Sequence, residues 1–166
     1  MKKLLKLLVL TFLIGGNTII SAQDSIKANV YLEQKIEGDT LKLCMAGTNL
    51  GEIVSFRFGI EFDSAALSYV SLESDILTID PSDVEFDQTI NVLKGVWSSP
   101  NAGGYIFSDY KSFITLIFYR KLDRERYCFT FAEAKYRFEF LNESNTLKVE
   151  KYGSCDPFDL GYGFAK

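Results

Sequence analysis

The sequence predicts an all-β protein, built as a β-sandwich or barrel of about eight to nine short strands. In several segments apolar and polar residues alternate, which is the period-two pattern of half-buried strands. Turn-forming residues separate these segments, and no segment after residue 22 has the periodicity of a helix of normal length. The sequence contains fourteen phenylalanines, thirteen of them after residue 22, which can fill the space between two sheets.

The first elements expected in the mature chain form a β-hairpin. Ala28, Val30 and Leu32 alternate with polar or larger residues, and the same alternation returns from Leu41 to Met45. The segment 37–39, Glu-Gly-Asp, lies between them and has the composition of a tight turn.

Residues 54–72 show the clearest strand pattern in the chain. Apolar residues alternate there with polar or small ones: Val54, Phe56, Phe58, Ile60 and Phe62 on one parity, and Ser55, Arg57, Gly59 and Glu61 on the other. Asp63 and Ser64 break the pattern, and a second apolar run begins at Leu67. The segment therefore predicts a strand, an acidic corner and a second strand.

The middle of the chain combines an acidic segment with two apolar ones. Residues 73–89 hold six acidic residues and Pro81, which predicts a long exposed loop with a helical turn near Ser82. Residues 90–99 and 112–119 are apolar on both parities, so we expect strands that are covered on both faces. The second of these is the expected central strand.

The last third of the chain predicts three more strands. Aromatic residues alternate at 127–131 and again at 136–140, and a turn at 142–145 precedes Leu147 and Val149. From residue 153 onward no regular period remains. We expect residues 154–166 to form an irregular tail that packs on the domain.

Residues 1–22 have the features of a secretory signal peptide. A basic start with three lysines precedes an apolar core, and Ala22 ends a segment suited to cleavage. The apolar core is shorter than the roughly 20 residues that span a membrane. We therefore expect a single domain at residues 23–153, a bacterial secreted or periplasmic location, and no membrane attachment after cleavage.

The composition excludes several functions. Without the leader, 15 basic residues stand against 22 acidic ones, a net charge of −7, which disfavours nucleic acid and anionic membranes as partners. The chain has no histidine, so His-dependent triads and His-based zinc sites are excluded. Cys44, Cys128 and Cys155 leave two alternatives open: a bridge from Cys155 to a strand cysteine, or three free thiols.

The order of these segments resembles the cohesin family. Gly47–Ser74 contains a loop with Asn49 and an alternating strand that ends in Phe62-Asp63, followed by a small turn and by Leu67 and Tyr69-Val70. The segments INVLKGVWSSP and SFITLIFYRK are similar to later strands of that family, and the similarity extends over roughly residues 30–153. Cohesins belong to a jelly-roll superfamily that they share with carbohydrate-binding modules. The resemblance implies an antiparallel nine-stranded jelly roll and extracellular, non-catalytic recognition, because cohesins bind dockerins.

Four acidic residues are candidate site residues. Asp63 could be a catalytic or metal carboxylate, but an acid at a strand corner commonly accepts hydrogen bonds from the following backbone, and we favour this structural role. Asp80, Asp83 and Asp87 could chelate calcium through their oxygens. Their segment lacks the spacing of an EF-hand, so a solvated loop and no cofactor is the preferred interpretation.

Three aromatic residues are candidate ligand-binding residues. Trp97, Tyr105 and Tyr110 could form a stacking platform for sugars, although Trp97 lies on a strand that favours a core position. No spacing marks the carboxylate pair that a glycosidase needs, so we expect no enzyme.

These candidates lead to two hypotheses about function. The first is a dockerin-like protein partner in polysaccharide degradation or surface assembly, and the alternative is a polysaccharide held by the surface aromatics. The binding face is expected on the far side of the sandwich from residues 54–72, or in the loops around Asp80 and Tyr105.

Overall fold

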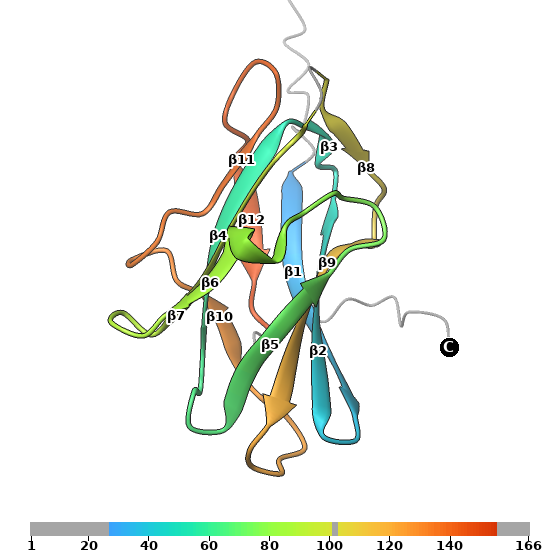
Figure 1. Ribbon diagram of the computed structural model, residues 1–166. Coiled ribbons are helices and arrows are strands. Elements are labelled where there is room, and N and C mark those ends of the chain that lie inside the picture. Colours follow the sequence, from blue (N-terminus) through green and yellow to red (C-terminus); the bar gives the residue numbers. More distant parts are fainter. Residues whose placement is uncertain (1–26, 101–102, 156–166) are drawn as a thin grey trace, which may run out of the picture.

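The computed structural model describes residues 27–100 and 103–155 as two β-sheets packed face to face, with a small third sheet at one end (Figure 1). One sheet, which we call the β9 sheet after its strand β9, has five strands. Their order is β12 (Val149–Tyr152), β1 (Ala28–Glu37), β2 (Thr40–Thr48), β9 (Ser112–Arg120) and β5 (Leu67–Glu73). The β4 sheet has the order β10 (Phe129–Phe131), β4 (Ser55–Phe62), β7 (Val92–Ser98) and β6 (Val84–Asp87), and β11 (Glu139–Leu141) also pairs with β4. The third sheet joins β3 (Gly51–Ile53) to β8 (Tyr105–Phe107). The predicted β-sandwich is confirmed.

The described residues form twelve strands, so the predicted number of eight to nine is too low. The predicted strands are present, and the additional ones are β3, β6 and β8, each of only three or four residues. Strand β6 corrects the prediction of one exposed loop at 73–89, because Val84 and Phe86 turn inward while Glu85 and Asp87 pair with Lys94. Such short strands depend on a partner strand and leave little pattern in the sequence.

The only helical element among the described residues is a single 3-10 turn, η1 (Pro81–Asp83), at the place predicted for a helical turn. Asp80 caps it, since its carboxylate accepts a hydrogen bond from the backbone N–H of Ser82 at 2.8 Å. No helix in residues 27–100 and 103–155 is long and apolar enough to cross a membrane.

The two long apolar strands are not covered on both faces as predicted. In β7, Val92 and Leu93 are buried, but Val96 is 45% exposed. In β9, Tyr119 at the outer side is 52% exposed, although β9 does lie inside its sheet between β2 and β5. Each strand therefore has one open side over part of its length, as expected in a sandwich of two layers.

Aromatic side chains of β4 and β9 join the two sheets. The Phe56 ring meets the Phe113 ring edge-on at 5.5 Å, and Phe62 meets Phe118 in the same way at 5.0 Å. Edge-to-face pairs at this separation add to the free energy that burial of the rings contributes. These contacts keep the inward-facing side chains of β4 in the core between the two sheets.

A glycine makes room for a third ring of β4. Gly95 lies opposite Phe58 in the β4–β7 register, and a Cβ atom at Gly95 would come within 2.3 Å of the Phe58 ring. Only glycine leaves that volume free, which explains a glycine in the interior of a strand.

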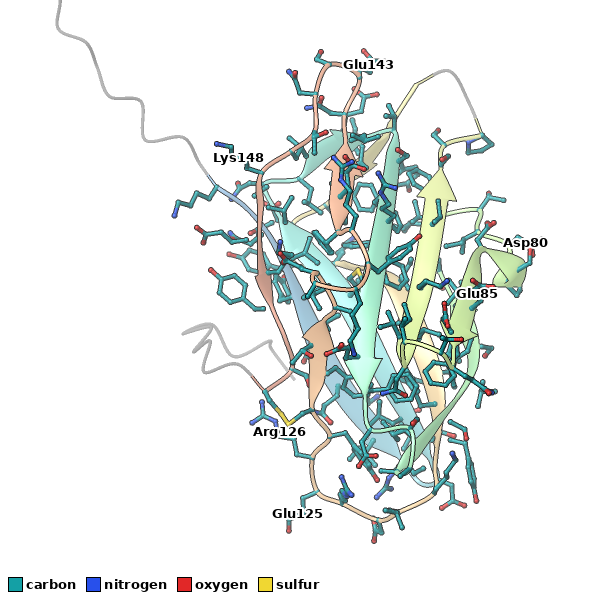
Figure 2. All side chains as sticks on the ribbon, turned by 90° about the vertical axis from the view of Figure 1, so that its left-hand side faces the viewer. Asp80, Glu85, Glu125, Arg126, Glu143 and Lys148 are labelled. Carbon is teal, nitrogen blue, oxygen red and sulfur yellow. A yellow bond between two sulfur atoms is a disulfide. The ribbon has the colours of Figure 1, made fainter. Side chains whose placement is uncertain are left out.

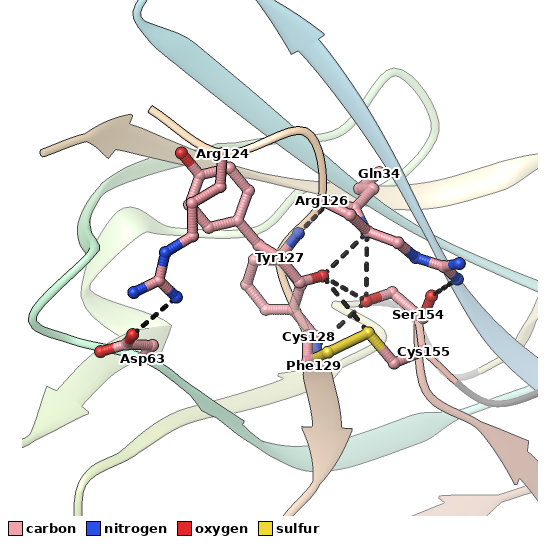
Figure 3. The surroundings of a disulfide bond; sticks show 9 residues. All are labelled: Gln34, Asp63, Arg124, Arg126, Tyr127, Cys128, Phe129, Ser154 and Cys155. Carbon is pink, nitrogen blue, oxygen red and sulfur yellow. Dashed lines mark hydrogen bonds and ion pairs between the residues drawn. A yellow bond between two sulfur atoms is a disulfide. The ribbon is translucent and has the colours of Figure 1, made fainter. Parts of the chain in front are cut away.

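A disulfide anchors the end of the domain (Figure 3). Cys128, just before β10, is bonded to Cys155, just after β12, so the bridge encloses β10, β11 and β12. Beside it, the Ser154 hydroxyl accepts a hydrogen bond from the Phe129 N–H at 3.1 Å and donates to the Tyr127 carbonyl at 3.0 Å. The Cys128–Cys155 bond decides between the two alternatives for the cysteines, a bridge from Cys155 or three free thiols. Cys44 is the free thiol.

The ends of the chain lie outside the described residues. The predicted signal peptide, residues 1–22, and the part of the predicted tail beyond Cys155 are not among the described residues. The proposed domain boundaries therefore stay predictions.

Removing the disulfide should destabilise the domain. The closed loop spans 27 residues, for which the chain-entropy relation gives about 3.5 kcal/mol. The double variant Cys128→Ser/Cys155→Ser should therefore unfold at lower urea concentration than the oxidised wild type, with both chains measured under identical conditions. Cys44→Ser is the control for the loss of a thiol. Equal stability of the double variant and this control would contradict the structural role of the bridge.

Candidate functional site

The outer side of the β4 sheet presents the polar and small residues of β4, which alternate with its buried aromatic and aliphatic residues. Because Phe56 and its alternates point into the core, Ser55, Arg57, Gly59 and Glu61 point outward. Strand β7 lies on one side of β4, and β10 and β11 follow one another along the other side (Figure 2). These four strands form the part of the outer surface that surrounds β4, and β6 continues the sheet beyond β7.

Residues 132–138, between β10 and β11, fold over one half of this surface. The Ala132 N–H donates to the Gly59 carbonyl at 2.9 Å, and the Tyr136 side chain packs on Gly59, where a Cβ atom would come within 2.8 Å of it. Lys135 bonds to Glu61 at 2.6 Å. A part of the chain thus covers the half of β4 near Gly59 and Glu61.

The other half stays open and forms a shallow depression of about 160 Å³. We call it the β4–β7–β11 depression. Its lining comes from three strands: Ser55, Phe56 and Arg57 from β4, Val96 and Ser98 from β7, and Glu139 and Leu141 from β11. The register places Ser98 opposite Ser55 and Val96 opposite Arg57, so polar and apolar groups lie side by side.

Two charged residues, Arg57 and Glu139, line the depression, and a third, Arg137, pairs with Glu139 beside it. Glu139 is only 7% exposed, and its Oε2 atom accepts hydrogen bonds from Nε (2.8 Å) and Nη2 of Arg57. Arg137 pairs with the other oxygen, Oε1, at 2.6 Å. The hydrogen bond from Arg57 holds the pKa of the Glu139 carboxyl below its ordinary value, and the charges of both arginines act in the same direction. Glu139 is therefore an ionised anchor for Arg57.

Solved structures of cohesins match this architecture. The cohesin of a type I cohesin–dockerin complex from Clostridium thermocellum matches with a TM-score of 0.62 and 16% sequence identity, over 76% of this chain and 95% of its own. The third cohesin of ScaC from Acetivibrio cellulolyticus, in complex with a dockerin, matches with a TM-score of 0.61, 18% identity and coverages of 76% and 94%. The chain has the cohesin fold. This confirms the resemblance seen in the sequence.

The likeness extends to a cohesin described as non-cellulosomal. The protein from Archaeoglobus fulgidus matches with a TM-score of 0.55 and 13% identity, over 76% of this chain and 87% of its own. No protein-family model and no curated protein matches the sequence. The cohesin fold is thus retained here with a sequence that differs from its solved counterparts at most positions.

Within this cohesin fold, Asp63 lies at the corner between β4 and β5. Its carboxylate accepts a hydrogen bond from the Ala65 N–H at 3.0 Å and pairs with Arg124 at 2.9 Å. The bond from the Ala65 backbone, together with Arg124, holds the Asp63 pKa below its ordinary value. Both contacts join the Asp63 carboxylate to groups beside the corner, one in the following turn and one on Arg124.

The three candidate calcium ligands have other partners. Asp80 and Asp83 cap η1 reciprocally, since Asp83 accepts a hydrogen bond from the Asp80 N–H at 3.1 Å. Asp87 accepts a hydrogen bond from Thr89 N–H and pairs with Lys94. Within the described part of the chain, no three acidic or cysteine side chains are grouped as a metal site would require.

The structure does not bring the three candidate aromatics onto one surface. Trp97 is 3% exposed, stacks on Phe56 at 5.3 Å, and donates its indole N–H to the Thr78 carbonyl at 3.0 Å. Tyr105, on β8, is 38% exposed, and Tyr110, which follows β8 and lies near Tyr31, is 49% exposed. A platform that includes Trp97 is excluded, because a sugar cannot reach a buried ring.

The depression was not predicted from the sequence. The binding face was expected away from residues 54–72, yet the depression lies on the outward side of β4 itself. The alternation did indicate that Ser55 and Arg57 face outward. Glu139 and Leu141 come from a three-residue strand 82 or more positions away from Arg57, and nothing in the sequence indicated which strand would pair there.

Replacing Glu139 should change how stability depends on pH. A lowered pKa in the folded state means that the stabilisation is present above the unfolded value of about 4.3 and is lost as the pH falls through the folded pKa. Glu139→Gln should therefore be less stable than the wild type at pH 7, and the difference should narrow below about pH 4.

Thermal unfolding across this pH range measures the effect of Glu139→Gln. The control is Glu143→Gln, because Glu143 lies on an exposed turn and makes no ion pair within the described part of the chain. The measurement extends to about pH 3, so that it crosses the usual range of carboxyl pKa values. A difference in stability between wild type and Glu139→Gln that stays constant over this range would contradict the assigned charge state.

Proposed function

We propose that the mature chain is a secreted, non-catalytic recognition module that binds a protein partner, of dockerin type, through the β4–β7–β11 depression and the surface around it. The observation that carries this proposal is the open half of the β4 sheet, where a half-exposed valine, two serines and an arginine line one depression. A partner protein can cover such a surface with a matching apolar and polar patch.

The shape of the depression favours a protein over a small ligand. Its volume of about 160 Å³ is below the roughly 300 Å³ at which small-molecule sites usually begin. Protein interfaces instead cover about 800 Å² on each side and need no deep cavity. Arginine is also enriched in such interfaces, and Arg57 is held in place by Glu139.

The solved counterparts support a dockerin-like partner. Two of the matched cohesins, from Clostridium thermocellum and Acetivibrio cellulolyticus, are described in complex with dockerins. The biological setting that we propose is extracellular polysaccharide degradation or assembly at a cell surface. The counterpart from Archaeoglobus fulgidus is described as non-cellulosomal. Assembly at a cell surface is therefore proposed beside polysaccharide degradation.

The disulfide supports a location outside the cytoplasm. Disulfides persist in oxidising compartments, and Cys128–Cys155 joins the two ends of a structural unit rather than a reactive site. Together with the predicted signal peptide, it favours secretion or a periplasmic location.

A charge placed in the depression should prevent partner binding. Val96→Asp replaces a half-exposed valine at the centre of the proposed interface, so binding should weaken on the order of tenfold or more. Val70→Asp is the matched control, because Val70 is 59% exposed on β5 of the other sheet. Binding is measured by calorimetry against recombinant dockerins, including those of the two complexes named above, and against dockerin-bearing proteins from the producer's secretome.

Two results would contradict this assignment. If none of these dockerins binds the wild type, a dockerin-like partner loses its support. If binding is equally strong for Val96→Asp and weaker for Val70→Asp, the partner binds the β9 sheet instead.

The alternative function is polysaccharide binding through Tyr105 and Tyr110. The observation that favours it is that both rings are partly exposed beside the β3–β8 sheet. Affinity electrophoresis on cellulose, xylan and chitin should then retard the wild type, and Tyr105→Ala should migrate faster. Migration of the wild type at the same rate with and without each polymer would exclude this alternative for those polymers.

A further inference from the structure

The guanidinium group of Arg57 has hydrogen-bond donors to spare. Its Nε and Nη2 atoms both donate to the Oε2 atom of Glu139. The Nη1 atom makes no hydrogen bond to any residue in the described ranges 27–100 and 103–155. The side chain is 39% exposed and lines the depression. Glu139 thus fixes one edge of the guanidinium and leaves the outer edge open to a ligand.

Two hydroxyl groups lie in the same depression. Ser55 and Ser98 are opposite each other on β4 and β7, and neither hydroxyl makes a hydrogen bond within the part of the chain that the structure describes. Val96 and Leu141 complete the lining with apolar surface. Unused donors surrounded by apolar groups are the usual means of fixing one polar group of a ligand.

The charge cluster at the depression, which includes Arg137 beside the lining, is net positive on a surface that is otherwise neutral or negative. Two arginines, Arg57 and Arg137, share the single negative charge of Glu139. On the same side of the β4 sheet, Lys94 pairs with both Glu85 and Asp87, which leaves an excess negative charge. Since the mature chain carries a net charge of −7, this local positive charge would attract a single negative group.

We propose that the β4–β7–β11 depression binds the carboxylate of an aspartate or glutamate side chain of the partner protein, with Arg57 donating from its outer edge and Ser55 and Ser98 donating from their hydroxyls. This inference rests on the proposed function, and it adds the chemistry of the partner. Arginine suits a carboxylate because its planar group donates two parallel hydrogen bonds. One excess positive charge beside Val96 and Leu141 matches a singly charged group with an apolar stem better than a phosphate.

The first test uses acetate as the probe and needs no identified partner. Side-chain and backbone NMR signals of the oxidised mature chain are followed during titration with sodium acetate, and sodium chloride at equal ionic strength is the reference. The Arg57 Nε–H signal and the Ser55 and Ser98 amide signals should shift with acetate and saturate. Equal shifts in chloride, or no shift at Arg57, would overturn the inference.

A matched pair of arginine variants separates this site from general charge effects. Arg57→Gln should abolish the acetate shifts at Ser55 and Ser98. Arg124→Gln should leave them intact, because Arg124 has similar exposure, 46%, and also pairs with a carboxylate, but lies at the Asp63 corner. Thermal unfolding of both variants shows whether each still folds. Retention of the shifts in a folded Arg57→Gln variant would overturn the inference.

The second test uses any dockerin that binds the wild type. Arg57→Gln should weaken binding on the order of tenfold or more and reduce its dependence on salt, whereas Arg124→Gln should bind as the wild type does. Arg57→Lys keeps the charge but loses the paired donors, so its affinity should lie between those of the wild type and Arg57→Gln.

The two proposals fail in different ways. If Val96→Asp prevents dockerin binding and Arg57→Gln does not, the interface is correct and the carboxylate inference is wrong. If neither variant changes the affinity for a bound dockerin, the proposed interface itself is wrong.

Discussion

The edge-to-face contacts of Phe56 with Phe113 and of Phe62 with Phe118 hold the two sheets together, and much of the remaining structure depends on them. They fix the inward parity of β4, so that a shift of one residue would bring Arg57 into the core and expose the rings. A third inward-facing ring of β4, Phe58, needs space in the neighbouring strand, and Gly95 supplies it. The packing of the core thus determines which side chains of β4 face outward.

The candidate site exists because two short strands, β10 and β11, pair with β4 along the side that faces away from β7. Strand β10 pairs with Phe62 and Ile60, the chain then leaves the edge, and β11 returns to pair with Ser55 and Arg57. The segment between them covers Gly59 with Tyr136. The outer side of β4 is therefore half covered by the protein itself and half open, and the disulfide encloses the whole segment that produces this arrangement.

Electrostatics give the open half its character. A buried carboxylate without partners would be costly, but Glu139 has two arginines beside it and stays ionised. In return, the carboxylate orients Arg57 and leaves part of its guanidinium free. An arginine held in this way loses little side-chain freedom when a partner binds, which is a general advantage of preorganised interface residues.

The sequence alone determined the fold class, because period-two alternation at 28–32, 41–45 and 54–62 permits few structures other than strands with one buried face. It also determined that Arg57 faces away from the core and that Asp63 lies at a corner. Tertiary structure decided the pairing of Cys128 with Cys155, the burial of Trp97 and the meeting of Arg57 with Glu139. These depend on which distant segments become neighbours, and a strand of three residues such as β11 acquires its place only from the strand it pairs with.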